Sequence, residues 1–388
     1  MNRTYKYRLR PNKRQAQSLD ILSWQARTLY NAALEQRISV FRETQKGIHY
    51  PEQWSHFRDE RKKKPETYGL LNATSVQQML RRLDKSFKAF FRGLKAGGTA
   101  GFPRYKGYSR FKSVEYRYGD GCKVRKIENG QVRFYLQNVG EIKVIYHRPI
   151  PQDAEIKHVV VKRNNDRWYV CLMLVIPEPE QRPIPKGSPV GIDMGLKSLL
   201  ATSDGILFNN PRWLRQSQSE LRIAQRKVAR RQKGGSRWRK AVRQVARKHE
   251  KIANQRLDYW HKICHDLAQN HSLIAIEDLN LKFMNRNSHL AFSSYDAGFG
   301  LFQRLLAYKV ENTGCQLVVV NPAYTSQECC NCGTIVKKGL SVRIHHCPNC
   351  GMKIDRDVNA ARIVLLRAFR ALGLSVQDLT WAVAPCVS

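Results

Sequence analysis

The sequence predicts an α+β protein with more than one domain, and three observations support this prediction. Helical periodicity dominates from Lys13 to about Gly93, and short strands with turn signals follow from Val114 to Ile176. The remainder alternates strands with helices, beyond a proline-rich boundary at Pro177–Pro189. With 388 residues, the chain is long enough for two or more compact units.

The chain is strongly basic, with 68 Lys and Arg residues against 31 Asp and Glu, a formal net charge of +37. A merely solvated basic surface is the alternative, but self-repulsion of this size is best offset by bound phosphates, so we expect a nucleic-acid partner. The opening MNRTYKYRLRP has no apolar core of a signal peptide, and the longest apolar run, Trp168–Ile176, is too short to span a bilayer. We therefore expect no membrane partner.

The first expected strand, Thr4–Arg10, alternates Tyr5, Tyr7 and Leu9 with basic residues, so that one face can pack while the other meets phosphate. Pro11 ends this strand, and helices follow.

A later helix in the same region has two distinct faces. Its apolar stripe consists of Val76, Leu80, Leu83, Phe87 and Phe90 or Phe91. Gln78, Arg81 and Arg82 share another face with Lys85, and their amide and guanidinium groups suit base edges and phosphates. A plain solvated face is the open alternative for these candidate nucleic-acid contacts.

The segment Lys95–Ser113 is a glycine-rich linker in which Tyr and Phe alternate with Lys and Arg. Interleaved aromatic and basic residues can stack on bases while they bind the backbone. From Val114 to Ile176, short strands broken by turn signals at Glu128–Gln131 and Asn164–Arg167 predict a small β-barrel.

The C-terminal half has a different order of elements. Pro189–Phe208 reads as three strands with an Asp204-Gly205 turn, and Pro211–Asn270 reads as a long basic helical stretch interrupted at Gly234-Gly235. The further expected elements are a buried strand at Ser272–Leu279, a helix at Tyr295–Gly314, a strand at Cys315–Pro322 and a last helix near Asp357. This order, β-β-β-α-β-α-β-α, is that of the ribonuclease H-like fold. The basic stretch supplies three further candidate nucleic-acid contacts, Arg226, Arg230 and Arg231.

Two Cys-x2-Cys pairs, fourteen residues apart, predict one tetrahedral zinc site with four thiolate ligands. The ligands are Cys329, Cys332, Cys347 and Cys350. A glycine follows each pair and permits a tight turn, and four thiolates close the site, so the zinc is structural. His345 and His346 are alternative ligands. Five of the ten cysteines lie in this short stretch, which indicates metal binding in a reducing compartment rather than disulfides.

Three carboxylates stand out in the C-terminal half. Asp193 lies in an apolar strand beside glycines, and Glu277 ends a buried strand, where a charge is costly unless it binds something. Asp357 starts the last helix, where the helix dipole favours its ionised form. In the ribonuclease H-like order these elements converge, so we expect a site for two Mg²⁺ ions that cleaves phosphodiesters.

Simpler explanations exist for each carboxylate taken alone. Glu277 could pair with an arginine, and Asp355 or Asp357 could cap the helix. Helical spacing places Asp357 on the same inward face as Ala360 and Ala361, whereas Asp355 precedes the helix and suits a capping position.

The chain resembles the TnpB (OrfB) proteins of insertion sequences, which are related to type V CRISPR effectors. The resemblance spans nearly the whole chain to about Leu372, and it rests on YKYRLRPNKRQAQSLDILSWQARTLYNAALEQR, GFPRYKGYSRFKS, GIDMGLKSLLATSDG, IAIEDLNLKFM, NPAYTSQECCNCG and CPNCGMKIDRDVNAARIVL. Asp193, Glu277 and Asp357 match the catalytic acids of that family, and the four cysteines match its zinc ribbon.

The resemblance implies a prokaryotic, cytoplasmic RNA-guided DNA endonuclease. It implies a guide RNA from the transposon end, a double-stranded DNA target beside a short motif, and one protein per RNA. It also implies a RuvC-like nuclease domain (186–325 and 352–373) with an inserted zinc ribbon (326–351). A wedge β-barrel (1–10 and 106–180), a helical recognition domain (11–105) and a tail (374–388) complete the implied organisation.

Two other functions remain open from the sequence. One is a non-cutting regulator that occupies nucleic acid, which the three intact acids argue against. The other is a transposase that needs no guide, and copurifying RNA would separate it from the endonuclease.

Overall fold

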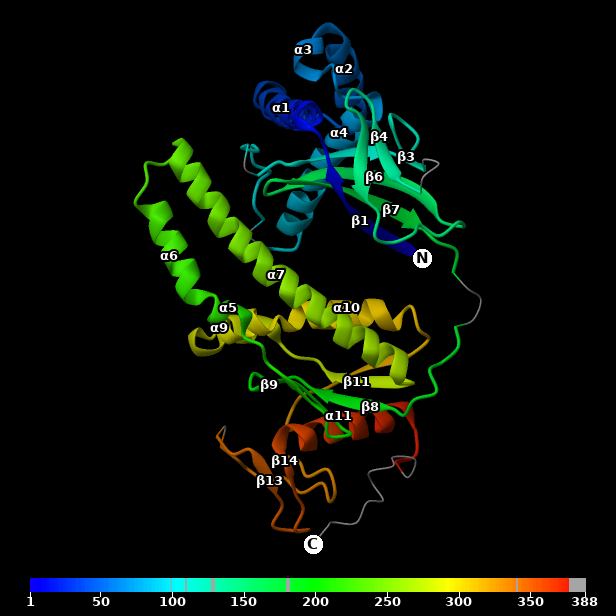
Figure 1. The fold of residues 1–388 in the computed structure, drawn as a ribbon, viewed down its shortest axis with the longest axis vertical. Coiled ribbons are helices and arrows are strands. Elements are labelled where there is room, and N and C mark those ends of the chain that lie inside the picture. Colours follow the sequence, from blue (N-terminus) through cyan, green and yellow to red (C-terminus); the bar gives the residue numbers. More distant parts are fainter. Residues whose placement is uncertain (99, 109, 127–129, 179–181, 340, 377–388) are drawn as a thin grey trace. The chain divides into compact units, whose positions relative to one another are not determined.

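The computed structural model describes residues 1–98, 100–108, 110–126, 130–178, 182–339 and 341–376 (Figure 1). The chain forms two compact units, Met1–Glu178 and Pro179–Ser388, and the division between them falls within the proline-rich boundary that the sequence predicts. Among the described residues, no helix is both long enough and apolar enough to cross a membrane.

Four helices of the first unit occupy the region predicted to be helical. They are α1 (Lys13–Thr44), α2 (Tyr50–Lys63), α3 (Pro65–Tyr68) and α4 (Ala73–Lys95). The two long helices α1 and α4 begin where the side chains of Asn12 and Asn72 accept hydrogen bonds from the backbone three residues later. The predicted apolar stripe of α4 is buried up to Phe87, but Phe91 is 53% exposed because the last turns of the helix extend past the core.

The strands of the first unit form one antiparallel sheet. They are β1 (Asn2–Arg10), β2 (Ser113–Arg117), β3 (Cys122–Lys126), β4 (Val132–Leu136), β5 (Gly140–Ile145), β6 (Glu155–Asn164) and β7 (Arg167–Val175). Their order is β2-β6-β7-β1-β5-β4-β3, so the N-terminal strand lies at the centre of the sheet. Among the described residues, no pairing joins the edge strands β2 and β3, so the sheet is not closed into the predicted barrel.

Both predicted hairpins of this sheet pair as expected. β6 and β7 meet at Asn164–Arg167, where Asn165 adopts a positive φ of 51°. The signal at Glu128–Gln131 lies between the paired strands β3 and β4, although residues 127–129 lie outside the described part of the chain.

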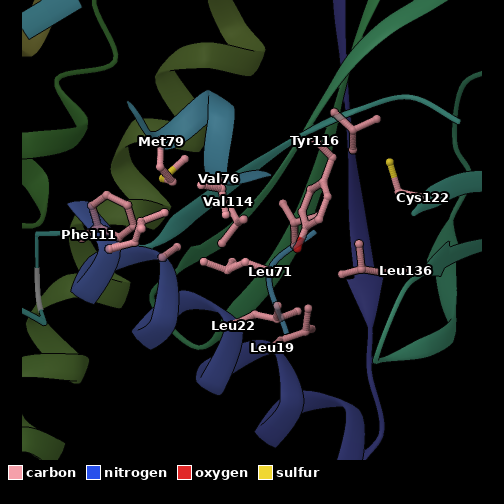
Figure 2. Packing of buried hydrophobic residues seen from close by; sticks show 14 of the residues in the cluster. Leu19, Leu22, Leu71, Val76, Met79, Phe111, Val114, Tyr116, Cys122 and Leu136 are labelled. Atoms are coloured by element: carbon pink, nitrogen blue, oxygen red, sulfur yellow. The ribbon is translucent and has the colours of Figure 1, made fainter. Parts of the chain in front are cut away.

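One continuous core joins the sheet and helices of the first unit. Figure 2 shows Leu19 and Leu22 of α1 close to Leu71, with Val114 and Tyr116 of β2 nearby. The alternating residues Tyr5, Tyr7 and Leu9 of β1 belong to the same core, as the sequence predicts.

The second unit contains a mixed five-stranded sheet. Its strands are β8 (Val190–Asp193), β9 (Ser198–Thr202), β10 (Leu207–Asn209), β11 (Leu273–Glu277) and β12 (Gln316–Val320), in the order β10-β9-β8-β11-β12. β8, β11 and β12 are parallel, whereas β9 is antiparallel to β8 and to β10. The predicted order of strands and helices is therefore present.

The helices of the second unit are α5 (Trp213–Gln216), α6 (Gln218–Ala229), α7 (Ser236–Asn270), α8 (Leu281–Arg286), α9 (Ser288–Ala297), α10 (Phe299–Val310) and α11 (Arg356–Leu372). The basic stretch breaks at Gly234-Gly235, as predicted. The single helix predicted over Tyr295–Gly314 is wrong, because Gly298 takes a positive φ of 74° and separates α9 from α10.

Alternation along the strands assigns two faces to this sheet. Ile192, Ile274 and Ile276 share an apolar cluster with Trp260 of α7 and Phe302 of α10. Leu273 and Ala275 of β11 pack instead with the buried face of α11, including Val364 and Leu365. The sheet thus lies between α7 and α10 on one face and α11 on the other (Figure 1).

Candidate carboxylate site and metal centre

Strand alternation directs two of the predicted acids toward α11. Asp193 follows Ile192, and Glu277 follows Ile276; both isoleucines belong to the cluster on the opposite face. Asp193 and Glu277 are the last residues of two neighbouring parallel strands, β8 and β11. Their side chains therefore lie on the face covered by α11, at the carboxyl ends of the strands.

The third acid, Asp357, lies in the first turn of α11. Asp355 is the N-cap, and its side chain accepts hydrogen bonds from the backbone N–H groups of Asp357 (2.8 Å) and Val358 (3.2 Å). The predicted capping role of Asp355 is confirmed. Ala360 and Ala361, predicted to share the inward face with Asp357, are fully buried.

Gly191 explains how α11 approaches the sheet so closely. A Cβ atom at this position of β8 would lie 2.1 Å from the carbonyl oxygen of Ala361 and 2.8 Å from the backbone nitrogen of Leu365. Any side chain here would push the helix away. The glycine two residues before Asp193 thus allows the helix that carries Asp357 to reach the strand that carries Asp193.

Asp193 interacts electrostatically with both of the other carboxylates. Burial raises the pKa of Asp193 well above its usual range, and Glu277 and then Asp357 raise it further. Burial also raises the pKa of Glu277 and of Asp357, whereas the hydrogen bond from Thr325 lowers that of Glu277 and Arg343 lowers that of Asp357. Oxygen donors with mutually repelling charges fit divalent cations such as Mg²⁺.

The three acids do not form a single tight cluster. Among the described residues, the one group of His, Cys, Asp or Glu whose ligand atoms all lie within 4.8 Å of one another consists of cysteines. The carboxylates are therefore spaced more widely than one ion would require from all three. The three carboxylates are the type of ligand found in sites for two metal ions, where the ligands are shared between the two ions.

Two basic residues that the sequence did not single out lie beside the acids. Arg343 Nη1 is 3.9 Å from Asp357 Oδ1, and Lys197 acts on the same carboxylate. Both line a polar cavity of about 280 Å³ with Arg212, Arg215 and Phe292. Four basic side chains therefore line this cavity.

Asp296, which the sequence analysis did not identify, lines this cavity. Its carboxylate, 4% exposed, accepts hydrogen bonds from the backbone N–H groups of Leu214 (2.9 Å) and Arg215 (3.2 Å) and pairs with Arg256 at 3.4 Å. These contacts hold the start of α5, and with it Arg215, at the rim of the cavity.

The four predicted zinc ligands converge. The sulfur atoms of Cys329, Cys332, Cys347 and Cys350 all lie within 4.8 Å of one another, with 3.6 Å between Cys329 and Cys350 and 3.5 Å between Cys332 and Cys347. Thiolates held tetrahedrally at about 2.3 Å from one zinc ion lie roughly 3.8 Å apart. The donor set therefore fits Zn²⁺.

Each cysteine pair sits on the same type of turn. Gly333 and Gly351 have φ values of 74° and 69°, and each donates its N–H at 2.9 Å to the first cysteine of its pair. The second pair lies between the short strands β13 (Ile344–His346) and β14 (Lys353–Asp355). The sequence predicted these glycine turns correctly.

The residues next to the ligands stay outside the cluster. Cys330 contacts the sulfur of Met352 at 3.6 Å, and neither His345 nor His346 belongs to the four-thiol group. His345 is fully buried, and its ring nitrogen pairs with Lys338. Cysteine ligation without histidine is therefore the arrangement that the structure supports.

The predicted basic contacts on α4 differ from one another. Arg81 lies over the ring of Tyr50 and lines a hollow of about 410 Å³ with His49 and Lys88. Arg82 instead donates to Ser113 at 3.1 Å and lies over Phe111, so it also supports the fold. Both guanidinium groups are exposed, and Gln78 is half-buried.

The other three basic candidates lie where α6 ends and the chain turns toward α7. Arg226, Arg230 and Arg231 are all exposed. α6 and α7 pack against each other, and Leu221 and Ala224 of α6 and Ala241 of α7 are buried. The three candidate arginines therefore lie on the exposed surface of this helical pair.

Family models match three parts of the chain. A model described as "Probable transposase" matches residues 159–288, and a Cas12f1-like TNB domain matches residues 299–364. A helix-turn-helix domain model matches residues 1–46, where the structure has β1 followed by the single helix α1.

Curated relatives match most of the chain. A protein of Streptomyces pristinaespiralis named RNA-guided DNA endonuclease is 34% identical over 96% of this chain and 90% of its own. InsQ of Escherichia coli K12, with the same type of name, is 32% identical over 96% and 94%. The Cas12f1 endodeoxyribonuclease of Sulfoacidibacillus thermotolerans is 23% identical over 76% and 77%.

Solved structures share the fold at low sequence identity. The Cas12f1 chain in a complex with single-guide RNA and target DNA superimposes with a TM-score of 0.62 at 15% identity, covering 94% of this chain and 98% of that one. The mini-RNA-guided endonuclease CRISPR-Cas_phi3 gives a TM-score of 0.57 at 9% identity, covering 95% and 92%. The folded architecture is therefore that of these effectors.

Proposed function

This chain belongs to the TnpB (OrfB) family, and we propose that it is an RNA-guided endonuclease that hydrolyses phosphodiester bonds of DNA. The observation that carries the proposal is that Asp193 and Glu277 end two neighbouring strands, that Asp357 lies in the first turn of α11, and that both other acids raise the pKa of Asp193. Relatives that match nearly the whole chain have names with the same activity.

In this proposal, Asp193, Glu277 and Asp357 hold two Mg²⁺ ions, which when bound supply an activated water and charge stabilisation for the leaving oxygen. The chain's own side chains orient the DNA strand. Arg343, Lys197 and Arg215 surround the cavity beside Asp357 and would bind the phosphate to be cut or its neighbours. The preorganised positive charge stabilises the charge that develops on that phosphate.

The domain assignment follows the family. We assign residues 186–325 and 352–373 to a RuvC-like nuclease domain of ribonuclease H-like fold and residues 326–351 to a zinc ribbon that holds one Zn²⁺. Residues 1–10 and 106–180 would form the wedge domain, and residues 11–105 the recognition domain. The mixed sheet order and the four-thiol cluster support the first two assignments.

The proposed partners are a guide RNA from the transposon end and a double-stranded target beside a short motif, with one protein per RNA. A solved Cas12f1 complex that shares this fold contains single-guide RNA and target DNA. The net charge of +37 supports a polyanionic partner. Gln78, Arg81 and Arg82 are our candidates for contacts to the target duplex or the guide.

Sequencing of RNA bound to the protein, expressed with its native flanking DNA, tests the guide. Mg²⁺-dependent cutting of a target complementary to that RNA then tests the nuclease. A transposase without a guide would join DNA ends with no protected RNA. A non-cutting regulator would protect RNA or DNA and leave a matched target intact, so each alternative has its own outcome.

A further inference from the structure

The linker between α4 and β2 is held against α1 along one line. Asn31 donates its side-chain amide to the carbonyl of Lys106 at 3.1 Å and accepts the N–H of Lys106 at 2.8 Å. One turn later along α1, Glu35 accepts a hydrogen bond from the hydroxyl of Tyr105. One turn earlier, the guanidinium of Arg27 lies 5.7 Å from the centre of the Tyr108 ring.

These contacts fix the direction of the segment. Arg27, Asn31 and Glu35 recur every four residues and share one face of α1. Their partners come in the reverse order, Tyr108, Lys106 and then Tyr105, so the linker runs antiparallel to the helix. Because residues 101–107 have no strand or helix pairing, this row of side-chain contacts is what positions them.

Buried residues anchor both ends of the segment. Pro103 is buried, and Phe111 is 4% exposed within the core of the first unit, where Figure 2 shows it near Met79. Phe102 packs edge-on against Phe87 of α4 at 5.5 Å between ring centres. The segment is therefore attached to the unit at both ends and along its length.

The anchored segment nevertheless exposes its aromatic rings. Tyr108 is 69% exposed, Tyr105 49% and Phe102 47%, and Trp24, one turn before Arg27 on α1, is 43% exposed. Arg104 between these rings is also exposed, and Lys106 is half-buried. Aromatic residues and arginine also occur together in protein interfaces, but the net charge of +37 favours a polyanionic ligand. A single-stranded nucleic acid uses both ring faces and cations.

We propose that Phe102, Tyr105 and Tyr108, with Trp24, form a stacking platform for unpaired bases of an RNA strand, and that Arg27 and Arg104 bind its phosphates. This inference rests on the proposed function, because it assigns unpaired guide RNA to the platform. A duplex is a poor ligand, since its bases are already stacked and cannot lie on the rings.

The test compares binding of a fluorescent single-stranded oligouridylate to the full chain and to two variants. Tyr108→Leu keeps apolar volume and removes the ring, so affinity should fall about tenfold. Tyr108→Phe keeps the ring and should bind as the wild type does. Stacking releases no counterions, so the loss should be the same at low and high salt, with an unchanged slope of log K against log salt.

A second experiment, photocrosslinking, identifies which residues contact the RNA. Oligouridylate that carries 5-iodouridine should crosslink on irradiation, and mass spectrometry should find the adduct on Tyr105 or Tyr108. A fully paired RNA of the same sequence should give little adduct at either position. Wild-type affinity of Tyr108→Leu, a loss confined to low salt, no binding by the wild type, or adducts only elsewhere would each overturn the platform.

The two proposals fail differently. If the platform is wrong, Tyr108→Leu still binds RNA and cuts a matched target as the wild type does. If the endonuclease proposal is wrong, the wild-type chain itself carries no protected RNA or does not cut, whatever happens at Tyr108.

Discussion

The side chain of Asn359, two residues beyond Asp357, accepts a 3.1 Å hydrogen bond from the backbone N–H of Cys330, between two proposed zinc ligands. Its amide group also donates to the carbonyl of Glu328 at 2.7 Å. Asn359 is fully buried. Hydrogen bonds of Asn359 therefore attach the segment that carries the first cysteine pair to α11, the helix that carries Asp357. We expect disorder in either of them to affect the other.

Replacing Asn359 by Ala should loosen this connection. The change leaves the buried N–H of Cys330 without its partner, at a cost of about 1–3 kcal/mol, and removes the hydrogen bond to the partly buried carbonyl of Glu328. We expect faster removal of zinc by a chelator and slower cutting, with RNA affinity unchanged. Lys337→Ala is the control, because Lys337 is exposed in the same metal-binding segment and lies outside the four-thiol cluster. Equal zinc release by both variants would show that the connection is unimportant.

The zinc site itself is tested by Cys347→Ser. Cys347 is fully buried and belongs to the four-thiol cluster, so its loss opens the site and should disorder the segment next to Asp357. Metal analysis should find about one zinc per wild-type chain and much less in the variant, with reduced cutting. Cys330→Ser is the matched control, since its sulfur lies outside the cluster, and it should retain zinc. Active wild-type protein without zinc would contradict the prediction.

Arg343 should matter for cutting and not for guide binding. It lies 3.9 Å from Asp357 and lines the adjacent cavity, so Arg343→Ala should slow cutting of a matched target about a hundredfold. Arg343→Lys should recover part of the rate, because it restores the charge without the planar donor geometry. Lys353→Ala removes the same charge from an exposed position in β14 and serves as the control. Equal cutting by the two alanine variants would remove Arg343 from the site.

The exposed arginines at the end of α6 should contribute to RNA affinity through charge alone. If Arg226, Arg230 and Arg231 all contact phosphates, changing them to Ala should reduce the slope of log K against log salt by about 2 for a single strand. The triple Lys variant keeps the charges and should keep the slope. Titrations at several salt concentrations measure both, and an unchanged slope in the alanine variant would mean that these residues face solvent.

Much of the second unit follows from its sequence. The order of elements predicted that Asp193, Glu277 and Asp357 converge, and the capping position of Asp355 could be foreseen from helical spacing. The role of Gly191 emerges only in three dimensions, because it depends on how close the backbone of Ala361 comes. The break at Gly298 was missed because the apolar periodicity continues across it.

Long-range contacts explain the remaining surprises. Arg343 precedes the second cysteine pair and reaches Asp357 only through the folding of the metal-binding segment, so no local pattern identifies it. Asp296 gave no signal because its partners, the start of α5 and Arg256, lie far away in sequence. The predicted barrel required the edge strands β2 and β3 to pair with each other. The sequence of neither strand alone indicates whether such a pairing forms.

Asp357 and Asp355 provide the sharpest test of the carboxylate site. Asp357→Ala should abolish cutting, because it removes an oxygen donor at the position where α11 meets Asp193 and Glu277. RNA and target binding should survive, since the change leaves the basic surfaces intact. Asp355→Ala should retain measurable cutting and lose about 1 kcal/mol of stability, because Asp355 caps two backbone N–H groups of α11.

The decisive measurement is Mg²⁺-dependent cutting of a matched target by the two variants side by side, with RNA and target affinity and thermal stability recorded for both. Asp357→Asn is the informative third variant, because it keeps the shape of the side chain and removes the charge that a cation requires. It should be as inactive as Asp357→Ala. If Asp357→Ala cuts normally while Asp355→Ala is inactive with α11 still folded, the roles of the two aspartates must be exchanged. In that case the hydrogen bonds that Asp355 makes to the helix in this structure would have to break to free its carboxylate for the cation.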